Sequence, residues 1–584
     1  MHRHGAHFLD ATSARFALWA PNARSVSVML EQQPPIELLP EDDGWFTGVA
    51  ACQAGDQYCY RIVDKDGQTL EVADPASRYQ PDGVHGRSQL VDTSSFEWQH
   101  DWKGRPWREA VIHELHVGVH GGYAGVAGQF ERLAELGVTA VELMPVAQFP
   151  GKRNWGYDGV LPFAPQNSYG KPAELGRLID QAHGQGLMVM LDVVYNHFGP
   201  DGNYLHQYAS EFFDESRQTP WGAAIDFNRP AVREFFIQNA LMWITEYRFD
   251  GLRLDAVHAI DNPDFLVELA RRVREAVEPG REVWLVLENE HNQAFLLEQG
   301  FDAQWNDDGH NALHVLLTGE TEGYYEDYKD RPIEKLARCL GEGFVFQGQA
   351  NRHGTPRGEP SGHLPPSAFV LFLQNHDQVG NRALGERLTR LCPPQALRAA
   401  TALLLLTPMI PLLFMGEEQG SRSPFLFFTD HHDELADAVR EGRRAEFKGF
   451  AAFASPEKRE QIPDPNQAKT FEDSRPLTDT PEAVEWQALY RRLLDLRRQH
   501  VVPHLPAIRA EGARVLSDKA LTASWRLANG ERLRIDLNLA EHPCPLDLPG
   551  QERWLFDSSD HHEGATALAG HSCVVSLLPP DEEA

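Results

Sequence analysis

Acidic side chains recur in this sequence directly after short apolar segments, and arginine or histidine accompanies most of them. The segment Phe249–His258, FDGLRLDAVH, carries Asp255 two residues after Arg253. Residues two apart share one face of an extended strand, so this carboxylate and guanidinium lie together. Burying such a pair of charges costs free energy unless the charges are paired or serve a function. Three more segments end in polar groups: Asp192, Asn196 and His197; Glu288 and Glu290; Asn375, His376 and Asp377.

Acids arranged in this way suit two chemistries, a divalent-metal site and the cleavage of a glycosidic bond. The histidines at the strand ends lack the H-x-H or H-x-x-x-H spacing of joint metal ligands, which disfavours the metal site. In glycoside cleavage a charged carboxylate attacks the anomeric carbon, and a neutral carboxyl protonates the leaving oxygen. Arg253 favours a charged Asp255, the nucleophile, whereas Glu288 ends an apolar run that favours a neutral acid. Asp377, beside His376, is placed to hold ring hydroxyls.

Alternating strand and helix patterns over the middle of the chain predict how these residues are positioned. Apolar runs alternate with helical periodicity, and the glycines Gly137 and Gly186 each end a helical pattern before an apolar run. Eight strand ends can be counted, which predicts an α/β fold of the (β/α)8 TIM barrel type. The C-terminal ends of all strands meet on one face of such a barrel. The acids are therefore expected to converge there.

β patterns flank the predicted barrel on both sides. Alternating runs between residues 15 and 91 predict an N-terminal β-sandwich, and a hairpin pattern around Asn529-Gly530 predicts a small C-terminal β domain. The expected domains are 1–92, a carbohydrate-binding-like cap; 93–506, the barrel; and 507–584, the C-terminal domain. The aromatics expected in the core of the sandwich, not on a binding face, are Trp19, Phe46 and Tyr58.

Two insertions interrupt the barrel pattern. The segment 351–366 is rich in Gly, Pro and His and is expected to form a rim loop. The segment 416–480 is too long for an ordinary connection, so we expect it to form part of the wall of the site.

Composition and charge narrow the class of protein. The 584 residues exceed one ordinary core, and a content of 42% hydrophobic and 24% charged residues is typical of a globular protein. A net charge of −31 disfavours nucleic acid and anionic membrane as partners. Scattered cysteines, the lack of a signal-peptide pattern and the short apolar run 402–415 predict a cytoplasmic protein that does not span a membrane.

Four stretches resemble the sequence regions of the α-amylase family of glycoside hydrolases, in the same order: LDVVYNH, GLRLDAVH, the strand that ends at Glu288, and QNHD. The resemblance implies a retaining enzyme with Asp255 as nucleophile, Glu288 as general acid/base and Asp377 as transition-state stabiliser. The acid is assigned to Glu288, not Glu290, because Glu288 ends the apolar strand. Residues implied around the attacked sugar are Tyr157, Asp192, His197, Arg253, His258 and His376. In many amylases the asparagine equivalent to Asn196 helps bind calcium, but only a short insertion follows here, so we expect no metal or cofactor.

Further stretches resemble one branch of that family, the enzymes that release trehalose: WGYDGVLPFAPQNSYG, NHFGPDGNYL, DAVHAI, WNDDGHNALHVLLTGETEGYY and PFLFFTDH. This resemblance implies hydrolysis of the α-1,4 bond next to the terminal trehalose of maltooligosyltrehalose, which releases trehalose and a maltooligosaccharide. The residues expected on the trehalose side are Asp307, Asp308, His310, Tyr325, Phe427 and Phe428. His431 and His432 are expected in solvent, and Glu417 and Glu418 in an ion pair at the rim.

Three other functions remain open from the sequence. A glucan branching enzyme shares the barrel and the N-terminal β domain but transfers the glycosyl unit to a sugar 6-hydroxyl. A non-catalytic glycan-binding protein would keep the barrel without the reaction, although the complete set of three acids disfavours it. A metal-dependent barrel hydrolase is the third.

Overall fold

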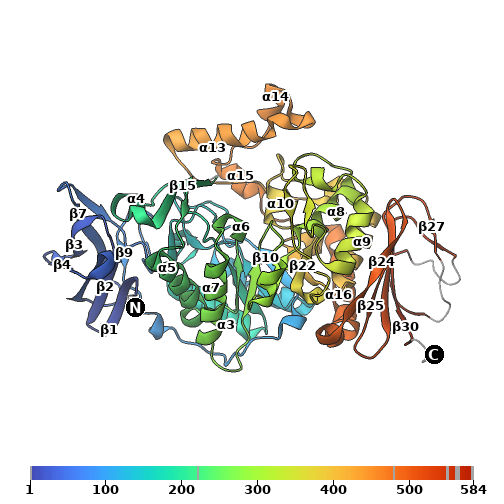
Figure 1. The fold of residues 1–584 in the computed structure, drawn as a ribbon, viewed down its shortest axis with the longest axis horizontal. Coiled ribbons are helices and arrows are strands. Elements are labelled where there is room, and N and C mark those ends of the chain that lie inside the picture. The colour runs from blue at the N-terminus through green and yellow to red at the C-terminus, as the bar shows by residue number, and fades with distance from the viewer. Residues whose placement is uncertain (1–2, 220–221, 478–479, 547–551, 560–565, 581–584) are drawn as a thin grey trace.

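The computed structural model describes residues 3–219, 222–477, 480–546, 552–559 and 566–580, and shows three parts in a row along the molecule (Figure 1). A β domain lies at the N-terminal end, an α/β barrel occupies the centre, and a second β domain lies at the C-terminal end. The architecture is the predicted one, a (β/α)8 barrel flanked by two β domains.

Two antiparallel sheets form the N-terminal domain. One has the order β1-β2-β6-β5 and the other β4-β3-β7-β8, with β9 paired to β7. The strands are β1 (Gly5–Asp10), β2 (Ser13–Trp19), β3 (Ala23–Leu30), β4 (Ile36–Glu37), β5 (Leu39–Pro40), β6 (Trp45–Ala51), β7 (Gln57–Asp64), β8 (Thr69–Val72) and β9 (Ser88–Gln89). Tyr58 of β7 packs edge-on against Phe16 of β2 at 5.1 Å, which joins the sheets. Trp19 and Phe46 are also buried, so these aromatics form the core as predicted.

Eight parallel strands close into the central barrel in sequence order. They are β10 (Ile112–Leu115), β11 (Ala140–Leu143), β14 (Met188–Val193), β17 (Gly251–Leu254), β18 (Trp284–Leu287), β19 (Ala303–Trp305), β22 (Phe369–Phe372) and β23 (Ile410–Phe414). Every residue in them is buried. Strands of a barrel are covered on both faces, and this is why their sequences are mainly apolar, with only one or two polar residues in some of them.

Helices connect these strands and cover the barrel. The longer ones are α2 (Phe130–Leu136), α3 (Pro172–Gly184), α5 (Pro230–Leu241), α7 (Pro263–Ala276), α8 (Asp307–Thr318), α9 (Pro332–Glu342), α12 (Pro394–Leu406) and α16 (Pro481–His500). The helix α5 ends at Leu241, and the chain continues in a π-helical turn, η6 (Met242–Glu246), before β17. Gly137 ends α2 with a φ of 107°, a left-handed conformation that glycine adopts without strain.

The insertion after β23 stands over one end of the barrel. It contains α13 (Asp433–Glu446), α14 (Pro456–Arg459) and α15 (Ala468–Asp473), and its residues 478–479 lie outside the described part. Figure 1 shows α13 and α14 projecting on the side of the barrel that carries α6 (Val257–Ile260) and α10 (His376–Gly380). Because α6 and α10 follow β17 and β22, the insertion lies over the C-terminal ends of the strands. The other insertion contains β21 (Pro356–Arg357), paired with β20 (Gln349–Ala350).

The C-terminal domain is a five-stranded antiparallel sheet in the order β24-β25-β26-β30-β28, with a separate pair, β27 and β29. The strands are β24 (Arg509–Ser517), β25 (Ala520–Arg526), β26 (Arg532–Asn538), β27 (Cys544–Pro545), β28 (Arg553–Asp557), β29 (Ala567–Leu568) and β30 (Ser572–Leu578). The predicted hairpin at Asn529-Gly530 joins β25 to β26. We keep 1–92, 93–506 and 507–584 as the proposed domains, since one boundary falls between β9 and β10 and the other between α16 and β24.

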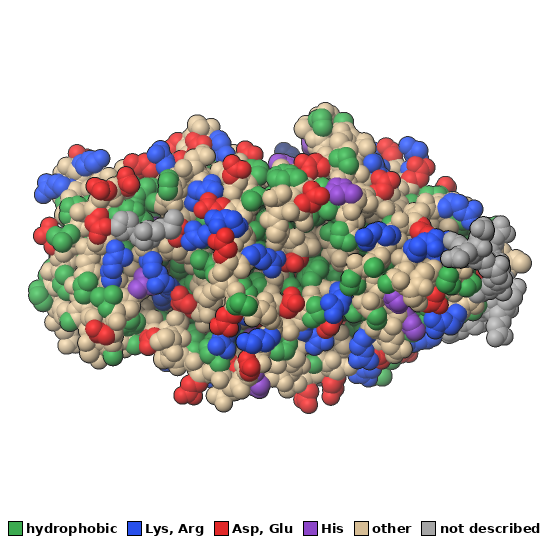
Figure 2. Space-filling model, turned by 60° about the horizontal axis from the view of Figure 1, so that its bottom comes forward, with side chains coloured by type: hydrophobic (Ala, Val, Ile, Leu, Met, Phe, Trp, Pro, Cys, Tyr) green, Lys and Arg blue, Asp and Glu red, His purple; other side chains and the backbone are tan. Residues whose placement is uncertain are grey.

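Three features of the molecule bear on the predictions made from composition. All six cysteines are free thiols. Acidic and basic side chains are interspersed over the face shown in Figure 2, so the charge of −31 is not gathered into one acidic patch there. Among the described residues, no helix combines the length and the apolar character needed to cross a bilayer.

Arg497 of α16 fastens the last barrel helix to the loop that precedes β23. Its buried guanidinium donates to the carbonyl oxygens of Leu405 and Thr407, at 3.1 and 2.6 Å, and of Met409 at 2.7 Å. Burial lowers the pKa of Arg497 to about 9. We expect Arg497→Met to leave buried carbonyls without donors and to lower the free energy of unfolding by about 2 kcal/mol. Denaturant unfolding would measure this.

The matched control is Arg498→Met, because the Arg498 side chain is 73% exposed. It should unfold like the wild type. Equal stability of the two variants would contradict the anchoring role.

Candidate active site

Arg253 lies at the centre of the candidate site and contacts three carboxylates. Its Nη1 donates to both oxygens of Asp192, at 2.8 and 2.7 Å, and to Oδ1 of Asp255 at 2.8 Å. Its Nη2 lies 2.8 Å from Oε2 of Glu288. The guanidinium carbon stands 4.0 Å from the ring centroid of Trp305. Burial opposes the charge of Arg253, but Asp192 and Glu288 outweigh it and raise the pKa of Arg253 well above its usual value. Arg253 therefore stays charged.

Strand register brings these groups together. Asp192 on β14 pairs with Arg253 on β17, and Asp255 and Glu288 each directly follow the last residue of their strand. The chain then turns sharply at Ala256, which has a φ of 41°, a left-handed conformation that costs of order 1 kcal/mol or more for a residue other than glycine. This turn aims the N–H of Ala256 at Oε2 of Glu288, at 2.8 Å. The strained residue thus links the two acids.

A second group of polar side chains surrounds the oxygens of Asp192. The Tyr157 hydroxyl donates to Oδ2 of Asp192 at 2.5 Å, and its ring stacks on His376 with centroids 5.0 Å apart. Burial raises the pKa of Asp192 to about 7, although Arg253 opposes this shift. Tyr157, Asp192, Arg253 and His376 therefore form one connected group at the strand ends, and their predicted place around one sugar stays a prediction.

His376 has a partner that sequence reasoning missed. Its Nδ1 lies 2.5 Å from Oε1 of Glu114, and its backbone N–H donates to the other oxygen of Glu114 at 2.9 Å. Burial would lower the pKa of His376, but the Glu114 carboxylate outweighs burial and raises that pKa to about 9. Glu114 interrupts the apolar run of the first barrel strand, β10, and that interruption was the available signal.

Asp377 lies in the first turn of α10, directly after His376. The side-chain amide of Asn381 donates to its Oδ1 at 2.5 Å. Burial raises the pKa of Asp377; the cation of His376 opposes the shift and the charge of Glu288 adds to it. Asp307, the first residue of α8, behaves alike, because burial and the charge of Glu288 raise its pKa well above the usual value. The site thus gathers more acids than cations.

Two histidines of the predicted set lie at the edge of this group. His197 is buried, its Nε2 lies 2.9 Å from the carbonyl oxygen of Tyr157, and burial lowers its pKa to about 4. Its neighbour Asn196 donates to Oδ2 of Asp255 at 3.2 Å. His258 is partly exposed on α6, where its Nδ1 accepts the N–H of Glu290 at 3.3 Å. His197 therefore contacts the backbone of Tyr157 from within the protein, and His258 lies on the rim.

On the expected trehalose side, the aromatic residues Tyr325 and Phe427 lie partly exposed near the acids. Tyr325 stacks on His314 at 4.0 Å, and the negative charge of Asp377 is among the causes that raise its pKa; burial is the largest. Phe427 packs edge-on against Trp155 at 5.2 Å. Trp155 in turn packs edge-on against His376 at 5.7 Å, so one ring separates Phe427 from the polar group at the strand ends.

Three other residues predicted for that side are buried within the protein. Asp308 is fully buried: it binds the hydroxyl of Tyr328, the N–H of Val345 at 2.7 Å and the guanidinium of Arg357 at 3.2 Å, so its oxygens are occupied within the protein. His310 is buried against Phe372, with ring centroids 5.4 Å apart. Both side chains lie within the protein because α8 is buried on nearly all sides, and their predicted role on the trehalose side stays a prediction. Phe428 is likewise fully buried.

Of the four remaining residues, His432 and Glu418 lie as predicted, whereas His431 and Glu417 do not. His431 was expected in solvent but is buried, with Nε2 3.4 Å from Oδ2 of Asp158; His432 is exposed as predicted. Glu418 forms the expected ion pair, with His113 at 3.2 Å and Arg132 at 2.8 Å. Glu417 instead accepts hydrogen bonds within the protein, and burial raises its pKa to about 7.

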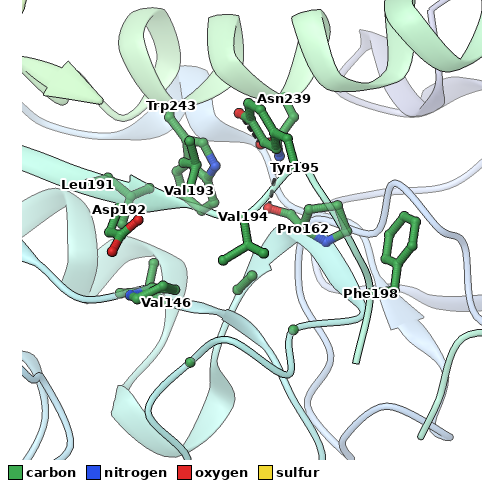
Figure 3. Close-up of a pocket in the computed structure, with 14 residues that line it drawn as sticks. Val146, Pro162, Leu191, Asp192, Val193, Val194, Tyr195, Phe198, Asn239 and Trp243 are labelled. Atoms are coloured by element: carbon green, nitrogen blue, oxygen red, sulfur yellow. Dashed lines mark hydrogen bonds between the residues drawn. The ribbon is translucent and has the colours of Figure 1, made fainter. Parts of the chain in front are cut away.

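A cavity behind Asp192 is too small to be the substrate site. Figure 3 shows it lined by residues that include Leu191, Tyr195, Asn239 and Trp243, with Tyr195 and Asn239 hydrogen-bonded to each other. Its volume of ≈ 20 Å³ holds about one water molecule. This cavity lies behind Asp192 and is not a path by which a sugar could reach the acids.

The residues that the structure describes include no group of three or more His, Cys, Asp or Glu side chains arranged to hold a metal ion. Asn196, the position that raised the question of calcium, turns its amide toward Asp255 and the backbone of Ala256. The expectation that the enzyme needs no metal or cofactor stays a prediction.

Comparisons with known proteins agree with this architecture. Residues 82–221 match the alpha amylase catalytic domain, residues 3–77 match carbohydrate-binding module 48 (isoamylase N-terminal domain), and residues 509–575 match a domain of unknown function, DUF3459. A malto-oligosyltrehalose trehalohydrolase of Saccharolobus solfataricus is 39% identical over 516 residues, which are 84% of this chain and 86% of that relative. One of Deinococcus radiodurans is 40% identical over 506 residues, 84% and 82% of the two chains. A crystal structure of a candidate alpha amylase from Salmonella typhimurium has a TM-score of 0.92 and 42% identity, and covers 99% of both chains.

The closed barrel, the acids at its strand ends and the matching catalytic domain together define a glycoside hydrolase of the α-amylase type. Within that class, the identity over most of both chains places the protein in the malto-oligosyltrehalose trehalohydrolase family.

The raised pKa of His376 predicts how stability depends on pH. A histidine whose pKa is raised by folding stabilises the folded state fully below its unfolded value of 6.5, and this contribution is lost as the pH rises through the folded value of about 9. We therefore expect the free energy of unfolding to fall between pH 6.5 and 9, and to fall less in His376→Gln. Denaturant unfolding at a series of pH values would measure both slopes.

His432→Gln, a change in an exposed loop, is the control and should keep the wild-type slope. Parallel slopes for the wild type and His376→Gln would show that the Glu114–His376 pair does not carry the effect.

Proposed function

We propose that this enzyme hydrolyses the α-1,4 glucosidic bond next to the terminal trehalose of maltooligosyltrehalose, with retention of configuration, and releases trehalose and a maltooligosaccharide. One observation carries the mechanism: the carboxylates of Asp255 and Glu288 bind adjacent nitrogens of one guanidinium, Arg253. This arrangement holds the acids close together, and retaining enzymes need a separation of about 5–5.5 Å. The names of relatives that match most of this chain support the substrate.

Asp255 is the proposed nucleophile. Its Oδ1 is bound by Arg253 and its Oδ2 by the amide of Asn196, contacts that suit a charged carboxylate. It attacks the anomeric carbon, the bond to the leaving oxygen breaks, and a covalent glycosyl-enzyme forms. Water then attacks the same carbon and frees Asp255.

Glu288 is the proposed acid and base. It protonates the oxygen that leaves with trehalose, and in the second step it takes the proton from the attacking water. In the free enzyme its Oε2 is bound by Arg253 and by the N–H of Ala256, which are contacts of a charged group. The acid role therefore requires Glu288 to carry a proton once the sugar is bound.

The other groups hold the attacked sugar and the leaving group. We propose that Asp377, Asp192 and His376 bind ring hydroxyls of the attacked sugar and that the Tyr157 ring, stacked on His376, covers one face of it. Asp307, Tyr325 and Phe427 are proposed for the trehalose side, while His258 lies further out on the rim.

The products formed from maltooligosyltrehalose test the proposed bond. We expect trehalose in equimolar amount to a maltooligosaccharide whose new reducing end is first formed as the α-anomer, because the mechanism retains configuration. Chromatography identifies the products, and proton NMR in the first minutes identifies the anomer. Initial formation of the β-anomer would refute the covalent route.

The same incubation separates the main alternative, a 1,4-α-glucan branching enzyme. That enzyme passes the glycosyl unit to a sugar 6-hydroxyl, so amylose would gain α-1,6 branches. Branching without release of trehalose would replace our proposal.

Substitution of the acids tests the assigned roles. We expect Asp255→Asn, Glu288→Gln and Asp377→Asn each to lower kcat by at least about 10³-fold, because each removes a charge or a proton needed in the transition state. Glu290→Gln is the matched control for Glu288→Gln: it lies two residues away, and the Glu290 side chain is 65% exposed. Loss of activity in Glu290→Gln with activity retained in Glu288→Gln would reverse the assignment of the acid.

A further inference from the structure

The insertion after β23 reaches the active site through one buried arginine. Arg443 is the residue of α13 that is buried, at 7% exposure. Its Nη2 donates to the carbonyl oxygens of Gly380 at 2.9 Å and Arg382 at 3.0 Å, and its Nη1 donates to Glu446 at 2.9 Å. One guanidinium thus binds two backbone carbonyls of the turn that follows α10.

Those two carbonyls stand on either side of Asn381. The side-chain amide of Asn381 donates to Oδ1 of Asp377 at 2.5 Å, and its backbone N–H donates to the carbonyl of Asp377 at 3.0 Å. A displacement of the turn 380–382 would therefore displace the donor that fixes the Asp377 carboxylate. Arg443 is linked to Asp377 through two successive hydrogen bonds and one residue of backbone.

Packing holds the turn from both sides. On the outer side, the Arg443 guanidinium lies 5.5 Å from the ring of Phe427 and 4.7 Å from that of Phe447. On the inner side, a Cβ added at Gly380 would stand 2.1 Å from the ring of Trp155, so the turn has no room to move toward the barrel. A small apolar cluster seats the insertion on the same turn; it consists of Ala383, Phe447 and Ile462, with Phe450 and Phe453 packed against it.

We propose that Arg443 is a positioning residue for the hydrolysis: from the insertion it fixes the turn 380–382 and, through Asn381, aims the Asp377 carboxylate at the sugar. The inference rests on the proposed function, in which Asp377 touches the substrate. It gives the insertion a role in the chemical step as well as in forming a wall, and Arg443 itself touches neither sugar nor reacting atom.

A double-mutant cycle tests this link. Arg443→Met and Asn381→Ala, alone and together, are compared with the wild type for kcat and KM on maltooligosyltrehalose. We expect each single change to lower kcat about 10-fold, since a misplaced group costs rate more than binding. KM should change by less than about 2-fold. Because both act through one carboxylate, the double variant should be no slower than the slower single variant.

The control is Arg444→Met, the next residue of α13, whose ion-pair partner Glu441 lies on the same helix. It should keep the wild-type kcat and KM. A kcat of Arg443→Met equal to that of the wild type, a change in KM alone, or losses that multiply in the double variant would each overturn the inference.

Two further variants keep the test decisive. Arg443→Lys keeps the charge, but it ends in one nitrogen on a shorter side chain and cannot bind the two carbonyls and Glu446 from separate positions as the guanidinium does. Its kcat should therefore also fall, and together with Asn381→Ala it decides the question if Arg443→Met does not fold. Asp377→Asn separates the two proposals. If it retains full activity, the proposed function fails; if it is inactive while Arg443→Met and Asn381→Ala behave like the wild type, only the present inference fails.

Discussion

The active site depends on one buried guanidinium that binds three carboxylates. Asp192, Asp255 and Glu288 come from three consecutive strands of the barrel, and they would repel one another at this range if Arg253 did not lie between them. A buried arginine is in turn costly without such partners. Each group is therefore stable only because the others are present, and the closed barrel is what brings the three strand ends within reach of one side chain.

Most of the fold follows from the sequence, because in a barrel local pattern and global position agree. Continuous apolar runs predicted the strands, glycine predicted the end of α2, and an Asn-Gly pair predicted the C-terminal hairpin. The order of strand ends also predicted that the acids would converge on one face, since the C-terminal ends of parallel strands lie there. The structure places Asp192 beside Arg253 on that face. The local pattern could not predict whether a side chain that follows the end of a strand is buried within the protein.

That limit explains the residues that were misplaced or missed. Asp308 and His310 follow β19 just as Asp307 does, but their side chains on α8 lie inside the protein. There Asp308 contacts Arg357 and His310 packs against Phe372. Partners so distant along the chain leave no mark in the local pattern. The pairing of Glu114 with His376 was missed for the same reason, since 262 residues separate them. The role of the long insertion likewise depends on a contact between α13 and α10 that is visible only in the folded protein.

The excess of acids over cations in the site bears on how the proton is supplied. Arg253 and His376 face Glu114, Asp192, Asp255, Glu288, Asp307 and Asp377, and burial raises the pKa of Asp192, Asp307 and Asp377 in particular. Such a cluster retains protons near neutral pH. A sugar that enters removes water, which strengthens every one of these interactions and makes an additional negative charge more costly. Glu288, the proposed acid, lies in this cluster with Arg253 and the N–H of Ala256 on its Oε2. The residues proposed to carry the reaction differ from those that would select the substrate. In the proposed function the acids and Arg253 cleave the glucosidic bond without choosing among glucans that fit, so we assign the choice of trehalose as leaving group to the residues around them, including those of the insertion and of the turn after α10.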